Sequence, residues 1–180
     1  MLLQAGGAVL RPVVLQLAGG FGVGPVVKLH QALRDVARPA ELVVIAGRNE
    51  KVRAELEALP PSPRHRVKIL GFTTDIDELM AAADLVVSKP GGLTTSETLA
   101  RGAVMVIVNP IPGQESRNSD FLLENGAAIK VNNLATLAHK VGALLDDPRR
   151  LAQLKANVAR VAKPRAAYDV VERSLKLLPQ

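Results

Sequence analysis

The sequence has 180 residues, of which 48% are hydrophobic and 22% charged, a composition typical of a soluble chain with one domain or at most a compact pair. The lack of cysteine excludes disulfides and thiol chemistry. No apolar run approaches the ~20 residues of a membrane span, and no basic segment precedes the apolar start as in a secretory signal, so we expect a cytoplasmic protein. The net charge of +6 suits phosphate-bearing ligands or an anionic membrane face better than nucleic acid, because aromatic residues are only 2% and the basic residues are scattered.

Short runs rich in Val, Ile and Leu alternate with segments of helical periodicity along the chain. Six such runs predict strands, at residues 13–18, 42–46, 67–70, 85–88, 104–108 and 127–131. Their continuity predicts strands buried on both faces. Because strand and helix alternate at least five times, the sequence predicts an α/β fold with a doubly wound, mostly parallel, six-stranded Rossmann-like sheet.

The pattern becomes wholly helical after residue 132. Two apolar stripes lie on either side of a break at residues 146–148, where Pro148 suits the first turn of a helix. We therefore expect one domain over residues 1–180. It would comprise a leader (1–12), the sheet with its helices (13–146) and C-terminal helices (147–180).

Ligands of such a sheet bind at the carboxyl ends of its strands, where loops lead into helix N-termini. Four loops follow predicted strands, with the sequences "AGGFGVGP", "GFTTD", "SKPGGLTTSE" and "NPIPGQESRN". In the first, Gly20, Gly22 and Gly24 would let backbone N–H groups approach a phosphate. A tight turn without a ligand is the alternative, since the spacing matches neither an intact dinucleotide motif nor a Walker loop.

The loop "SKPGGLTTSE" (88–97) carries more information. Its glycines, with Thr94 and Thr95, would lie at the N-terminus of a helix that begins near Thr94, where amides and hydroxyls can hold a diphosphate. Glu97, one turn later, would offer two acceptor oxygens to the diol of a ribose. The alternative is a capping box, in which Thr94 caps the helix and Glu97 reaches back to it.

The loop after the fifth predicted strand gathers amides and carboxylates. Gln114, Glu115 and Asn118 could together bind several hydroxyls of a sugar. For Ser119 and Asp120, a solvated position at the start of a helix is the better interpretation.

The order of these motifs, with the stretch "GFTTDIDELMAAADLVVSKPGGLTTSE" and then "VNPIPGQESRNSDFLLENGAA", resembles one family of transferases. It is similar to the C-terminal, donor-binding half of processive diacylglycerol glucosyltransferases and monogalactosyldiacylglycerol synthases, which belong to glycosyltransferase family 28 and have the GT-B fold. The resemblance runs over about residues 13–165. It implies inverting transfer of a hexose from UDP-glucose or UDP-galactose to a lipid hydroxyl, without a metal or another cofactor.

The resemblance also assigns roles to matching positions. The backbone at Phe72 and Thr73 would lie by the uracil, Glu97 would hold the ribose, and Glu115 with Asn118 would reach the hexose, with Gln114 behind them. The diphosphate would meet the Gly-Gly-Leu-Thr turn and the first glycine loop. The complete donor-binding set is Gly20, Phe21, Gly22, Gly24, Phe72, Thr73, Gly91, Gly92, Leu93, Thr94, Thr95 and Glu97, with Gln114, Glu115 and Asn118 at the sugar.

Two departures from the family limit what the chain is expected to do alone. The 180 residues do not accommodate the family's N-terminal domain, which carries the acceptor site and the general base. A Gly-x-Pro-x-Arg segment expected before the first strand is also missing. We therefore expect UDP-sugar binding with little or no turnover. A lipid acceptor would bind through the missing domain or a partner chain, with peripheral attachment to the inner membrane face, and an uncovered apolar surface could favour a homo-oligomer.

Other functions stay open from the sequence. A UDP-sugar epimerase with a GT-B-like fold, an NAD-dependent Rossmann enzyme and a docking scaffold are the alternatives, although "IAGRNE" offers no acid at the tip of the second strand for an adenosine ribose. Three histidines, His30, His65 and His139, are too dispersed for a metal site and are expected at the surface or on helix flanks. Lys89 is as consistent with a solvated position as with a phosphate contact.

Overall fold

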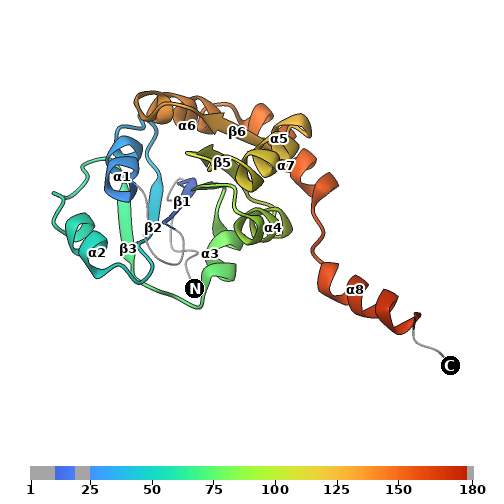
Figure 1. Cartoon of the computed structure of the whole chain (residues 1–180). Coiled ribbons are helices and arrows are strands. Elements are labelled where there is room, and N and C mark those ends of the chain that lie inside the picture. Colours follow the sequence, from blue (N-terminus) through green and yellow to red (C-terminus); the bar gives the residue numbers. More distant parts are fainter. Residues whose placement is uncertain (1–10, 19–24, 178–180) are drawn as a thin grey trace, which may run out of the picture.

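The computed structural model describes residues 11–18 and 25–177, which form a parallel sheet covered by helices (Figure 1). The strands are β1 (Val13–Leu17), β2 (Glu41–Ile45), β3 (Arg66–Leu70), β4 (Leu85–Ser88), β5 (Val104–Val108) and β6 (Ala128–Val131). Every strand pairs in parallel, in the order β3-β2-β1-β4-β5-β6. The predicted six-stranded, doubly wound Rossmann-like sheet is confirmed, and each strand lies within one residue of its predicted bounds.

Helices follow the strands in turn. Their bounds are α1 (Val26–Arg34), α2 (Glu50–Glu57), α3 (Ile76–Ala82), α4 (Gly92–Ala100), α5 (Gln114–Glu124), the 3-10 turn η1 (Leu134–Thr136), α6 (Leu137–Leu145), α7 (Pro148–Val161) and α8 (Ala166–Leu175). Apolar side chains of α1 and α6 pack together with Val14 and Leu42 on one face of the sheet. On the other face, Met80 of α3 packs against Leu15 and Val86, because successive strand residues point to opposite faces.

Burial on both faces was predicted for all six strands, and for β3 this is wrong. Residues Arg66, Val67 and Lys68 are exposed, and Val67 keeps 36% of its surface accessible. The reason is that β3 is an edge strand, paired only with β2. An exposed lysine and arginine on such an edge discourage pairing with another chain.

The C-terminal helices begin as the sequence predicts. Asp147 is the N-cap of α7, its side chain accepts a hydrogen bond from the Arg150 N–H, and Pro148 occupies the first helical position. Leu154 and Val158 of α7 are buried in the core.

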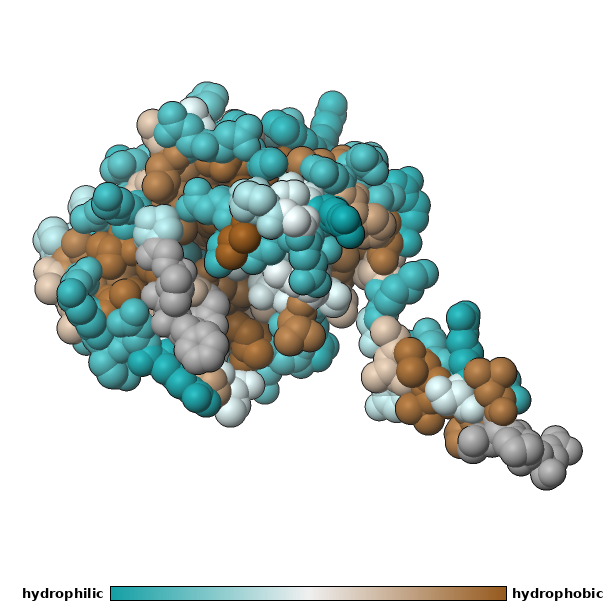
Figure 2. Space-filling model, viewed as in Figure 1, coloured by the Kyte–Doolittle hydropathy of each residue, from teal (hydrophilic) through white to brown (hydrophobic). Residues whose placement is uncertain are grey.

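The helix α8 extends away from the body of the molecule, and apolar side chains lie on its surface (Figures 1 and 2). Four of them are well exposed, namely Tyr168, Val170, Val171 and Leu175. The residues of this helix are all exposed, so it contributes nothing to the core. None of the helices within the described part of the chain combines the length and the apolar character that crossing a membrane requires.

Candidate functional site: a cavity at the carboxyl ends of β1, β4 and β5

A cavity of about 210 Å³ opens at the carboxyl edge of the sheet, between β1 and β4. The strand order reverses at this point, so the loops after β1 and β4 lead to opposite faces and leave a crevice between them. Its lining residues are Leu17, Ala18, Pro25, Val26, Leu29, Ser88, Lys89, Gly91, Thr94, Val108, Asn109 and Glu115. The predicted glycine-loop residues Gly20, Phe21, Gly22 and Gly24 lie outside the described residues.

The N-terminus of α4 borders this cavity. Gly91 is the N-cap in extended conformation, without a side-chain cap, and the first backbone bond of the helix joins the Thr95 N–H to the Gly91 carbonyl at 2.8 Å. The N–H groups of Gly92, Leu93 and Thr94 therefore precede the intrahelical bonds of α4 and are available to an anion. The expected helix start near Thr94 is two residues late, and the capping-box alternative is wrong because Thr94 is not the N-cap.

The remaining predicted residues of this loop differ in their positions. Glu97 is exposed on α4, one turn beyond Thr94, and Leu93 is 80% exposed. Thr95, by contrast, is buried, and its hydroxyl has no hydrogen-bond partner within the described residues. Thr95 is not among the cavity-lining residues, so its place among the donor-binding candidates is less favourable than that of Thr94.

The loop between β5 and α5 closes one side of the cavity. Its backbone turns sharply, with φ of 44° at Asn109 and 102° at Gly113, which is the left-handed region. The Glu115 carboxylate lines the cavity and accepts a hydrogen bond from the Ile111 N–H at 2.7 Å, which holds the loop in a compact turn. A glutamate fixed in this way can present its second oxygen to a hydroxyl group.

The loops after β4 and β5 contact each other directly. Asn118 donates from Nδ2 to the Pro90 carbonyl at 2.8 Å, and a Cβ placed on Gly92 would lie 3.6 Å from Nε2 of Gln114. The structure thus brings the predicted sugar-binding amides beside the predicted diphosphate loop. The expectation of a solvated Ser119 is wrong, because Ser119 is fully buried on the inner face of α5, whereas Asp120 is exposed.

Phe72 and Thr73 lie in the loop between β3 and α3, separate from the cavity lining. Phe72 is 58% exposed, and the guanidinium carbon of Arg48 lies 4.7 Å from the centre of its ring. The Thr73 hydroxyl accepts a hydrogen bond from the Asp75 N–H at 3.1 Å, so the loop has a defined turn.

Two of the three histidines are buried, which contradicts the expected surface positions. Burial lowers the pKa of His30 to about 4, and the neighbouring Arg34 and His65 act in the same direction. Burial likewise lowers the pKa of His65, whose Nδ1 accepts from the Ala40 N–H and whose Nε2 donates to the Arg34 carbonyl. Among the described residues, no group of three His, Cys, Asp or Glu side chains is arranged to hold a metal ion.

Sequence reasoning undervalued two residues that line the cavity. Asn109 directly follows β5 and Lys89 directly follows β4, so each stands at a strand's carboxyl end. Lys89 is half-buried and is the one cation among the described lining residues; its carbonyl accepts from the Gly91 N–H at 2.9 Å, whereas its ammonium group has no hydrogen bond or ion pair within the described chain. Their position immediately after a buried strand was the signal available to find them.

The strand order and the crevice at the reversal point define a Rossmann-like α/β domain with a ligand site at the carboxyl edge. The family model described as "Glycosyl transferases group 1" matches residues 20–161. A processive diacylglycerol beta-glucosyltransferase of Bacillus cereus (strain AH187) is 32% identical over 166 residues, which are 92% of this chain and 42% of the relative. The chain thus spans less than half the length of the curated relatives it matches.

Solved structures share the fold. MurG of Acinetobacter baumannii superposes with a TM-score of 0.74 at 23% identity, over 93% of this chain and 53% of that one. UDP-GlcNAc 2-epimerase of Neisseria meningitidis, bound to UDP-GlcNAc, gives a TM-score of 0.70 at 17% identity, over 92% of this chain and 44% of that one. The chain belongs to the group 1 glycosyl transferase family, and its fold is the Rossmann-like half of a GT-B glycosyltransferase.

Proposed function

We propose that this chain is the donor-binding half of an inverting glycosyltransferase that moves a hexose from UDP-glucose or UDP-galactose to a lipid hydroxyl such as that of diacylglycerol. The observation that carries the proposal is the convergence of the loops after β4 and β5 on one cavity. The free N–H groups at the start of α4, the Lys89 side chain and the Glu115 carboxylate border a single crevice. The names of the curated relatives support the lipid acceptor.

Each part of the donor has a matching group at this edge. The diphosphate would bind the N–H groups of Gly92, Leu93 and Thr94, where the helix dipole favours an anion. Glu97 would accept from the ribose hydroxyls, and Glu115 with Asn118 would meet the hexose. The cavity is smaller than the ~300–1,000 Å³ usual for ligand sites, so this half would enclose only part of the donor.

The chemistry that follows is electrostatic. The acceptor oxygen would attack the anomeric carbon while the bond to the diphosphate breaks and its electrons pass to UDP. The N–H groups of α4 would stabilise the charge that develops on the leaving diphosphate. A base from another domain or partner chain would take the acceptor's proton, and no metal is required in this scheme.

The surface near this edge carries exposed apolar residues, namely Phe72, Leu93 and Ile111. Their exposure supports the proposal that a second domain, a partner or a second copy covers this edge. The site would face the cytoplasm at the membrane surface.

Titration calorimetry on the 180-residue chain tests donor binding. We expect UDP and a UDP-hexose to bind and NAD not to bind. Glu97→Ala should weaken UDP binding at least tenfold, because two acceptors for the ribose diol are lost. Glu124→Ala, at the exposed far end of α5, is the matched control and should bind as the unmodified chain does.

The outcomes separate the alternatives. Binding of NAD would favour a Rossmann dehydrogenase, and conversion of UDP-GlcNAc would favour an epimerase. Failure to bind any nucleotide would contradict the proposal and favour a docking scaffold. With UDP-glucose and diacylglycerol vesicles, the chain alone should transfer no sugar, whereas a chimera carrying the N-terminal half of the Bacillus relative should.

A further inference from the structure

The loops after β2 and β3 are packed against each other beside Phe72. The Ala46 N–H donates to the Leu70 carbonyl at 2.8 Å, which extends the β2–β3 pairing by one step beyond the strands. A Cβ on Gly71 would lie 3.7 Å from the Gly47 carbonyl oxygen and 3.3 Å from Nη1 of Arg53. Gly71 thus lies directly against the turn that leads into α2.

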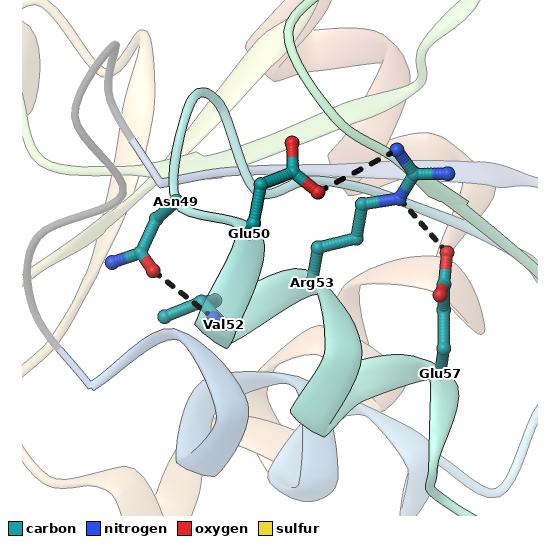
Figure 3. A network of polar contacts seen from close by, with 5 residues as sticks. All are labelled: Asn49, Glu50, Val52, Arg53 and Glu57. Atoms are coloured by element: carbon teal, nitrogen blue, oxygen red, sulfur yellow. Dashed lines mark hydrogen bonds and ion pairs between the residues drawn. The ribbon is translucent and has the colours of Figure 1, made fainter.

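Arg53 is itself held in place at this contact. Its Nε donates to Oε1 of Glu57 at 2.9 Å, and its Nη1 lies 3.9 Å from Oε2 of Glu50, one turn before it on α2 (Figure 3). The helix start is fixed in turn, because the Asn49 side chain accepts from the Val52 N–H at 3.1 Å. The Arg53 guanidinium, paired with two carboxylates, forms a wall behind Gly71.

Arg48 contacts the same loop on its outer side. Its guanidinium lies over the Phe72 ring, and both side chains are solvent-exposed. An exposed contact of this kind contributes little to folding. Arg48 in the turn after β2 and Arg53 on α2 thus lie beside two successive residues of the loop after β3, Phe72 and Gly71.

We propose that Arg48 and Arg53 are positioning residues that fix the backbone of residues 71–75 so that it discriminates the base of the bound nucleotide. This inference rests on the proposed function, with the uracil of the donor beside Phe72 and Thr73 as the family resemblance implies. Uracil offers a donor at N3 and an acceptor at O4, whereas cytosine reverses both. A backbone fixed in place pairs with only one of these patterns, but a loop free to move adapts to either.

Calorimetric titration of the 180-residue chain with UDP and CDP tests the proposal. Arg48→Met should weaken UDP binding about threefold, from an exposed cation–π contact, and should move the UDP/CDP affinity ratio toward one by the same factor. Arg48→Lys should restore most of the ratio, because an ammonium can occupy the same place over the ring. Arg53→Met should reduce the ratio further, because it removes the wall behind Gly71.

A double-mutant cycle shows whether the arginine acts through the ring. Arg48→Met and Phe72→Leu should each reduce the ratio, and the double variant should reduce it no further than either single variant. Arg66→Met, which removes an exposed arginine from the opposite end of β3, is the matched control and should leave the ratio unchanged.

Three results would overturn the inference. One is an Arg48→Met variant that loses affinity for UDP and CDP equally, which indicates a direct phosphate contact. The second is additivity in the cycle. The third is an unchanged ratio in both arginine variants. If the unmodified chain binds neither nucleotide, the proposed function itself fails, and this result is distinct from the other three.

Discussion

Polar groups make different contacts at the two edges of the sheet. At the amino edge, the Asp84 carboxylate accepts from the Val13 N–H at 3.0 Å through one oxygen and from Lys155 Nζ at 2.7 Å through the other. His65 likewise uses both ring nitrogens in hydrogen bonds to backbone groups. Side chains at this edge join strands and helices that are far apart in the sequence.

At the carboxyl edge, the groups are arranged differently. The first N–H groups of α4 lack a side-chain cap, the Lys89 ammonium has no partner within the described chain, and Asn109 has a left-handed backbone. Such features do not stabilise the free domain, and they are typical of ligand sites. We therefore expect contacts at the amino edge to contribute more to stability, and groups at the carboxyl edge to contribute more to ligand binding. Substitutions at one edge should leave the property of the other unchanged.

The prediction with the largest expected effect concerns the free energy of unfolding at acidic pH. The pKa of His30 is about 4 in the folded chain and near 6.5 when unfolded, so the unfolded chain binds more protons between these values. The free energy of unfolding should therefore fall as pH decreases through this window, by about 2 kcal/mol between pH 7.5 and 5.0 from His30 alone. His65, whose pKa is also lowered, acts in the same direction.

Urea unfolding of His30→Leu at the two pH values measures this contribution. The variant should lose about 2 kcal/mol less than the unmodified chain on acidification. His139→Leu, an exposed histidine on α6, is the control and should behave as the unmodified chain. Identical pH dependence in His30→Leu and the unmodified chain would contradict the prediction.

The next effect in size concerns the contact between strands. Asp84→Ala removes the acceptor of both the Val13 N–H and Lys155 Nζ, and the free energy of unfolding should fall by about 1.5 kcal/mol, since the carboxylate is only partly exposed. UDP affinity should not change. Asp120→Ala, an exposed carboxylate on α5, should alter the free energy of unfolding by less than 0.5 kcal/mol or so. A loss of UDP affinity in Asp84→Ala beyond that explained by unfolding would break the separation of the two edges.

Local sequence patterns predicted the fold well and the side-chain environments less well. The runs around β1, β4 and β5 were recognisable because both faces of a central parallel strand are apolar. The exposure of β3 was not recognisable from the sequence, because an edge position depends on the order of the strands in the sheet. Burial of His30 and His65 similarly depends on the packing of α1 against the sheet and on the loop before β3, which short-range periodicity does not encode.

The sequence located the loops that border the candidate site but not their individual contacts. The rule that ligands bind at carboxyl ends located the loops after β4 and β5, which the structure brings together through Asn118 and Pro90. The contact of Arg48 with Phe72 joins two different loops, and no spacing along the chain indicates it. The helix start at Gly92 was missed because a glycine N-cap has no side chain to mark it.

The smallest expected effect concerns the cation at the cavity. Lys89→Met should weaken UDP binding about fivefold, because one unit charge is removed from beside the diphosphate, and should change uridine binding little. The loss should diminish in 0.5 M salt, where screening already weakens the attraction. Lys68→Met, on the exposed edge strand, removes the same charge two strands away from β1 and should leave UDP binding intact.

If Lys89→Met weakened uridine and UDP equally, Lys89 would act on the shape of the cavity rather than on the phosphate charge. If it lowered the free energy of unfolding by more than about 1 kcal/mol, the carboxyl edge would contribute to stability as the amino edge does. The distinction between the edges would then be one of degree. A selective and salt-sensitive loss of UDP affinity, with stability unchanged, places the function of Lys89 in charge neutralisation and keeps the two edges separate.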